Sequence, residues 1–69
     1  MTMQITLNNR TELIDFEVLS LNQLIAYKNF TFKFLVTKVN HQLVKKDERD
    51  QVLVKDGDHV EVLHLISGG

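Results

Sequence analysis

The residues with the clearest chemical potential are the last three, Ser67, Gly68 and Gly69, which follow an apolar run over residues 60–66. Glycine has no Cβ, so two glycines form a narrow, flexible stem that can enter an active site closed to larger residues. We therefore expect the α-carboxylate of Gly69 to be presented on this stem to another protein. The alternative is an ordinary frayed terminus, because chain ends tolerate small residues.

The polar residues inside the chain form no comparable pattern. His41, His59 and His64 stand where a sheet would scatter them, and no His–Cys or His–Asp spacing resembles a metal site. We expect these histidines in turns and on the surface, with no metal bound. No glycine-rich loop opens a helix to hold phosphate, and no nucleophile has a neighbouring base. The sequence therefore predicts no catalytic residues, and a protein that is not an enzyme.

Composition indicates a small globular domain. The chain has 69 residues, 43% of them hydrophobic, and no cysteine, which fits a reducing cytoplasm. A net charge of −1 gives no basic surface for nucleic acid, and no segment reads as a signal peptide or a membrane span. We expect a cytoplasmic protein that binds neither nucleic acid nor membranes.

The first half of the chain predicts a hairpin followed by a helix. Residues 3–7 and 12–17 alternate apolar and polar side chains around a turn at residues 8–10. Ser20 is a predicted N-cap, and Gln23 stands where it can complete a capping box. The helix is expected over residues 20–29, with one face that is largely apolar: Leu21, Leu24, Ile25 and the stem of Lys28.

The second half predicts further strands joined by polar turns. In order, we expect a strand over 30–39 whose inward face is ambiguous, a turn at 40–41, a strand over 42–44, a charged loop with a helical turn over 45–50, a turn at 56–58 and a final strand through 66. The predicted core consists of apolar residues from the hairpin, helix and final strand: Ile5, Leu7, Ile14, Phe16, Leu24, Ile25, Val60 and Val62.

The final strand carries leucines on its predicted polar side. Val60 and Val62 point one way, so Leu63 and Leu65 fall on the side of Glu61. Exposed leucines beside a glycine tail favour a contact surface. We expect this surface to dock a partner, with four contributing residues: Leu63, Leu65, Ile66 and Ser67. The alternative is that the alternation slips near residue 63 and both leucines are core.

The order of these elements, with the closing segment 54–69, resembles the ThiS family, the ubiquitin-like sulfur-carrier proteins of thiamine biosynthesis. Residues 39–44 add a weaker match, and the resemblance covers essentially the whole chain. Lys45-Lys46 departs from the pattern, because a proline–arginine pair often stands there. Residues 18–20 replace a glycine-containing turn that often precedes the helix.

The resemblance implies an α+β fold of the ubiquitin-like β-grasp type, with a mixed sheet of four to five strands curled around one main helix. It places this domain over residues 1–66 and a flexible Gly–Gly tail over residues 67–69. It also implies that Gly69, carried by Gly68, is the reactive C-terminus.

The partners follow from the same resemblance. An E1-like adenylating enzyme (ThiF-type) uses ATP to adenylate Gly69, a sulfur donor converts the adenylate to a thiocarboxylate, and a thiazole synthase (ThiG-type) receives the sulfur. The chain itself is expected to bind no cofactor. The alternatives are the small subunit of molybdopterin synthase, a ubiquitin-like protein modifier and a plain scaffold domain. The absence of proline favours the thiamine branch over the molybdopterin branch.

Overall fold

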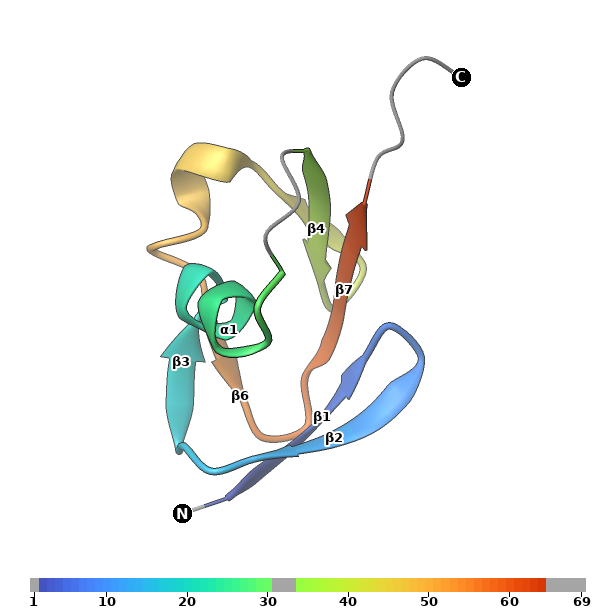
Figure 1. The fold of residues 1–69 in the computed structure, drawn as a ribbon, viewed down its shortest axis with the longest axis vertical. Coiled ribbons are helices and arrows are strands. Elements are labelled where there is room, and N and C mark those ends of the chain that lie inside the picture. The colour runs from blue at the N-terminus through green and yellow to red at the C-terminus, as the bar shows by residue number, and fades with distance from the viewer. Residues whose placement is uncertain (1, 31–33, 65–69) are drawn as a thin grey trace.

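The computed structural model describes residues 2–30 and 34–64. Along the chain its elements are β1 (Met3–Leu7), β2 (Arg10–Ile14), β3 (Val18–Ser20), α1 (Leu21–Tyr27), β4 (Leu35–Val39), β5 (Gln42–Val44), a 3₁₀ helix η1 (Lys46–Glu48), β6 (Leu53–Lys55) and β7 (His59–His64) (Figure 1). The expected tail over residues 67–69 lies outside the described residues.

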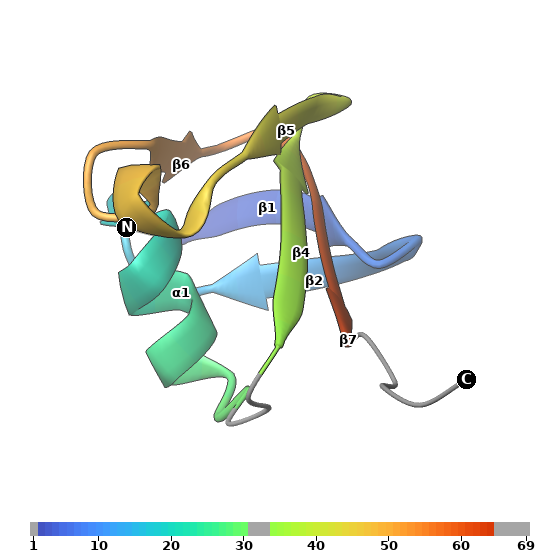
Figure 2. The same cartoon turned by 90° about the horizontal axis from the view of Figure 1, so that it is seen from above.

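Five strands form a mixed sheet in the order β2-β1-β7-β4-β5. The central pair β1–β7 is parallel, and the other pairs are antiparallel. Helix α1 covers one face of this sheet (Figure 2). The predicted β-grasp architecture, a mixed sheet around one main helix, is therefore confirmed.

A second, two-stranded sheet of β3 and β6 was not predicted. Leu19 pairs with Val54 in an antiparallel register, and both side chains are buried. Strands of three residues are too short to show a reliable alternation of apolar and polar positions. Residues 18–20, which replace a glycine-containing turn in the family pattern, thus form a strand that leads directly into α1.

Helix α1 begins and ends where the sequence predicts. The Ser20 hydroxyl accepts a hydrogen bond from the Gln23 amide at 3.1 Å, and the Gln23 side chain accepts from the Ser20 amide at 2.9 Å, which completes the capping box. At the other end, Asn29 has a φ of +58°, and the Phe30 amide donates to the Ile25 carbonyl at 3.0 Å. This is a Schellman ending. With seven residues, α1 is far too short to cross a membrane, and no longer apolar helix occurs in the described residues.

The core lies between α1 and the inward face of the sheet. Six of the eight predicted core residues are buried: Ile5, Leu7, Ile14, Leu24, Val60 and Val62. Ile25 is half-buried and packs against them. The buried set also contains residues that were not predicted: Met3, Leu19, Leu21, Val39, Val44 and Val54.

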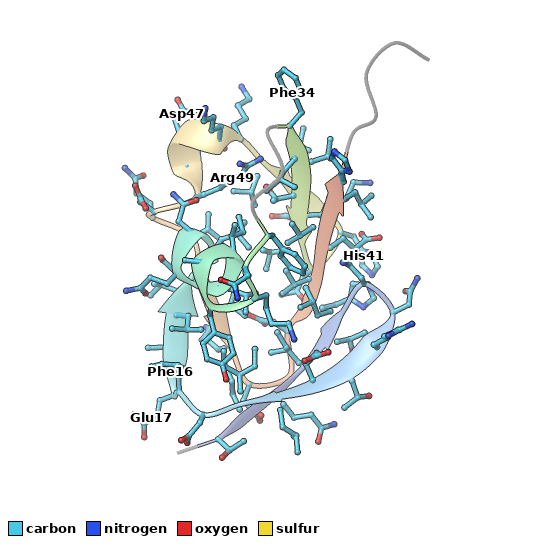
Figure 3. All side chains as sticks on the ribbon, viewed as in Figure 1. Phe16, Glu17, Phe34, His41, Asp47 and Arg49 are labelled. Atoms are coloured by element: carbon cyan, nitrogen blue, oxygen red, sulfur yellow. The ribbon has the colours of Figure 1, made fainter. Side chains whose placement is uncertain are left out.

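The prediction that Phe16 belongs to the core is wrong. Its side chain is 42% exposed and meets the Tyr27 ring edge-on, with centroids 5.6 Å apart. Strand β2 ends at Ile14, which pairs with Met3, the first residue of β1. The Phe16 amide then donates to the Ile14 carbonyl at 2.8 Å in a tight three-residue turn, which interrupts the alternation before Phe16. Figure 3 shows Phe16 at the edge of the molecule.

Strand β4 begins later than predicted. Phe30 belongs to the helix ending rather than to the strand, and residues 31–33 lie outside the described residues. The sequence did not show which face of this strand points inward. Thr37 and Val39 are buried, so the inward face of β4 is the one that carries these two side chains.

Arg49 follows η1 in the segment predicted as a charged loop, yet only 8% of it is exposed. Its Nε donates to Thr37 Oγ1 at 3.0 Å, and its Nη2 donates to the Leu35 carbonyl at 2.7 Å. Thr37 in turn donates to the Val44 carbonyl at 2.7 Å. The guanidinium therefore fastens this segment to β4 (Figure 3). The helical turn predicted in this segment is confirmed, whereas the burial of Arg49 was not predicted.

Candidate functional site

The candidate site is centred on β7, the strand that leads to the predicted reactive tail. Of the six predicted site residues, the structure describes only Leu63. The other five, Leu65, Ile66, Ser67, Gly68 and Gly69, lie outside the described residues. The described part of the site is thus the strand itself and the surface around it.

Asn8 holds β7 on one side. The parallel pairing of β1 with β7 stops at Leu7 and Val60, because the chain turns at Asn8. The Asn8 side chain then takes the place of a further strand residue: its Oδ1 accepts from the Val62 amide at 2.8 Å, and its Nδ2 donates to the Val62 carbonyl at 3.1 Å. Sequence reasoning assigned Asn8 to the turn alone and missed this second role.

Strand β4 holds β7 on its other side. The antiparallel register runs from Val39 opposite Val60 to Leu35 opposite His64. The backbone of β7 is therefore fixed on both sides as far as Val62 and on one side as far as His64. His64, the last residue of this described segment, therefore ends a strand that is held at the centre of the sheet.

The two faces of β7 differ as the sequence predicts. Val60 and Val62 are 0% and 5% exposed, whereas Leu63 is 45% exposed. The expectation that Leu63 is partly exposed is confirmed, and the alternative of a core Leu63 is wrong for the isolated chain.

Strand pairing extends the exposed surface beyond Leu63. Val36 lies directly opposite Leu63, Lys38 lies opposite Glu61, and Leu43 of β5 lies opposite Lys38. Leu43 is 62% exposed. We call these five residues the outer patch: three apolar side chains around one cation and one anion. The sequence indicated only Leu63 and Glu61, which share β7, because the other three residues come from β4 and β5.

The expectation that the histidines are scattered is wrong for two of them. The rings of His41 and His59 stack with centroids 4.8 Å apart and an interplanar angle of 30°. His41 belongs to the β4–β5 turn and His59 opens β7, so the sequence keeps them 18 positions apart while the fold brings them together. Among the described residues, Glu61 is the third potential metal ligand in this group.

A shallow hollow beside β5 offers less chemistry. Its lining includes Leu43, Val52 and a single charged residue, Glu48. The Glu48 carboxylate already accepts a hydrogen bond from the Lys45 amide at 3.1 Å, which caps η1. This lining therefore does not resemble a catalytic centre.

Comparison with known proteins gives one consistent result. The ThiS family model matches residues 3–69. A crystal structure of the thiamine biosynthesis protein (ThiS) from Geobacter metallireducens is similar, with 28% identity and a TM-score of 0.87 over 97% of this chain and 100% of that chain. An NMR solution structure of a thiamine biosynthesis protein from the same organism gives 28% identity and a TM-score of 0.80 over 97% of this chain and 88% of that chain. No curated protein matches at a significant level.

Proposed function

The chain belongs to the ThiS family, and on this basis we propose that it is a sulfur carrier of thiamine biosynthesis whose Gly69 carboxylate becomes a thiocarboxylate. The observation that carries the proposal is the family match over residues 3–69, which includes both glycines of the tail. The similarity to a thiamine biosynthesis protein along nearly the full chain supports the same branch.

The chemistry begins with an unreactive group. A carboxylate resists nucleophilic attack because its charge is delocalised and oxide is a poor leaving group. An E1-like adenylating enzyme transfers AMP from ATP to the Gly69 carboxylate and releases pyrophosphate. A sulfur donor then attacks the carbonyl carbon, AMP leaves, and the thiocarboxylate remains. In this scheme ATP and the catalytic residues belong to the partner, and the chain is a cosubstrate in the cytoplasm rather than an enzyme.

The thiocarboxylate sulfur is ionised at neutral pH and nucleophilic. Thiazole synthase is the proposed acceptor, which takes the sulfur into the thiazole ring. An oxygen from the acceptor or from water takes the place of the sulfur on the carbonyl carbon, so the carrier leaves with its carboxylate restored. Two enzymes of different chemistry must therefore bind the same small chain in turn.

The outer patch is the proposed docking surface for both enzymes. Leu63 is exposed and lies on the strand that leads to the tail. Its opposite neighbour Val36 and the nearby Leu43 extend the apolar area, and Lys38 and Glu61 add charges that can set orientation. Leu65, Ile66 and Ser67 are proposed to hold the tail in register within the partner's active site.

Intact-mass measurement tests the reactive group directly. The chain is incubated with a cognate adenylating enzyme, ATP and sulfide, and we expect a mass gain that corresponds to sulfur replacing one oxygen. A variant lacking Gly69, and a variant with one residue added after it, should show no gain while their thermal unfolding midpoints stay nearly unchanged. If the extended variant still gained sulfur, the carrier proposal would be wrong.

A gene knockout separates the thiamine branch from its alternatives. We expect the knockout strain to require thiamine or its thiazole moiety, while its molybdoenzymes remain active. The opposite phenotype would favour a molybdopterin synthase subunit. Lysine-linked conjugates of the chain in cell extract would favour a protein modifier.

A further inference from the structure

We propose that His41, His59 and Glu61 form a binding site for a divalent transition-metal ion such as Zn²⁺. Two imidazoles and one carboxylate are a common ligand set for such ions in proteins. Each of the three residues offers one ligand atom, and these atoms all lie within 4.8 Å of one another. The proposal does not depend on the chemistry of Gly69.

The backbone holds His41 beside His59. Asn40, the residue before His41, donates its amide to the His59 carbonyl at 2.6 Å, and its Oδ1 accepts from the His59 amide at 2.9 Å. The Asn40 Nδ2 donates to Asp58 Oδ1 at 3.1 Å. Three hydrogen bonds thus hold the β4–β5 turn against the start of β7. The backbone therefore keeps the two imidazoles side by side.

The turn conformation also directs His41. Asn40 and His41 have φ values of +50° and +70°, a region that is uncommon outside glycine and in which asparagine and histidine are enriched. This left-handed pair forms the tight turn between β4 and β5. The turn therefore keeps a bulky imidazole at a position where glycine or asparagine would be easier to accommodate.

Glu61 completes the set from the same strand as His59. Residues two apart on a strand project from the same face, so Glu61 and His59 share the outward side of β7. Both are half-buried, and His41 is exposed. The cluster therefore lies at the surface, where an ion can enter and where a fourth ligand position stays open to water.

The distances require only a small adjustment. Tetrahedral Zn²⁺ with ligand bonds near 2.1 Å places its ligand atoms about 3.4 Å apart. The widest pair in the cluster, at up to 4.8 Å, must therefore close by about 1.4 Å. His41 is exposed and Glu61 is half-buried, so rotamer changes of these two side chains are the proposed route to this closure.

The charges near the cluster permit a cation. Glu61 supplies a formal negative charge, and no ion pair engages it within residues 2–30 and 34–64. The strand register places one cation, Lys38 of β4, directly opposite Glu61. A metal ion bound at Glu61 would therefore compete with the Lys38 ammonium group for the carboxylate.

Zinc titration of the untagged, metal-free chain tests the proposal. Calorimetry should give one ion per chain, and NMR spectra should show the ring signals of His41 and His59 shifting together. Loss of an outer-shell partner of a metal site commonly costs 10–100-fold in affinity, so loss of a direct ligand should weaken zinc binding by at least about tenfold. We expect this loss in His59→Ala, in Glu61→Gln and in His41→Asn, where asparagine tolerates the positive φ.

His64→Ala is the matched control, because it removes a histidine of the same strand that lies outside the cluster. It should bind zinc as tightly as the wild type. Glu61→Gln keeps the size of the side chain, so it tests the site even if His59→Ala fails to fold. Equal loss in His64→Ala, unchanged binding in Glu61→Gln, or one zinc per two chains with dimer formation would each overturn the intrachain site.

Discussion

The two faces of β7 show how one strand can serve stability and function separately. On the inward face, Val60 and Val62 are almost fully buried in the core. On the outward face, Leu63 is 45% exposed, and His59 and Glu61 are half-buried. Residues 59–63 thus present an apolar surface to the fold and a mixed surface to the solvent.

Because the two faces differ, substitutions on the inward face should lower stability, and substitutions on the outward face should weaken partner binding. Removing an inward side chain leaves a cavity in a close-packed core, so stability falls. Truncating an outward side chain creates no cavity, so the stability changes little while the contact area for a partner decreases. The following experiments test whether the two faces separate in this way, in decreasing order of expected effect.

Leu24→Ala tests the inward side most strongly. Leu24 is fully buried on α1 and belongs to the same core as Val60. We expect a loss of about 2–5 kcal/mol in the free energy of unfolding, as for other buried leucines. Urea denaturation measures this loss. A change below that of an exposed leucine such as Leu13→Ala would show that the helix does not pack as described.

Leu63→Ala tests the outward side, and Leu65→Ala tests the prediction that this face continues along the chain. Truncating a well-packed interface anchor costs on the order of 2 kcal/mol, roughly thirtyfold in affinity. We expect this loss in binding to the adenylating enzyme or to thiazole synthase, with little change in the unfolding midpoint. Calorimetric titration and a thermal melt on the same samples measure both quantities.

Leu13→Ala is the control for these variants. Leu13 is a leucine of β2 that is 67% exposed, two strands away from β7. It should leave partner affinity unchanged. A drop of many degrees in the unfolding midpoint of Leu63→Ala would instead make this side chain part of the core.

Asn8→Gly tests whether β7 is held from its side. Glycine tolerates the φ of +52° at this position but removes both hydrogen bonds to Val62. We expect a loss of about 1–2 kcal/mol, at about 1 kcal/mol for each bond, and faster hydrogen exchange at the Val62 amide. Asn9→Gly is the matched control, because Asn9 shares the turn and its φ is +67°. If the two variants lost equal stability, the hydrogen bonds from Asn8 to Val62 would contribute nothing measurable.

Phe16→Ala should have the smallest effect. Phe16 lies outside the core and contacts Tyr27 edge-on. A double-mutant cycle with Tyr27→Ala should give a coupling of about 0.5–1.5 kcal/mol. If Phe16→Ala alone lowered the free energy of unfolding by about 3–5 kcal/mol, as is typical of a buried phenylalanine, Phe16 would belong to the core after all.

Much of the fold could be predicted because its signals are local. The capping residues Ser20 and Gln23 lie within one turn of each other, and the turns at Asn40 and Gly57 depend on residues that accept a positive φ. The strand ends were harder to predict. Strand β2 stops at Ile14 because its partner β1 begins at Met3, and a pairing limit of this kind is absent from the local pattern.

The candidate site was predicted only in part. The alternation along β7 was enough to place Leu63 outside and Val62 inside, because both positions belong to one strand. Val36 and Leu43 join the outer patch through pairing with other strands, which alternation within one strand does not reveal. The burial of Arg49 was missed for a similar reason, since its partners Leu35 and Thr37 belong to another element.

By itself, the sequence determined the order of the main elements, the caps and turns, the two faces of β7 and the resemblance to a sulfur-carrier family, because each depends on residue types at short spacing. Only the tertiary structure decided that Asn8 holds Val62, 54 positions away, and that His41 meets His59 and Glu61. The physical reason is that strand register fixes which distant residues become neighbours, and register depends on the packing of the whole sheet.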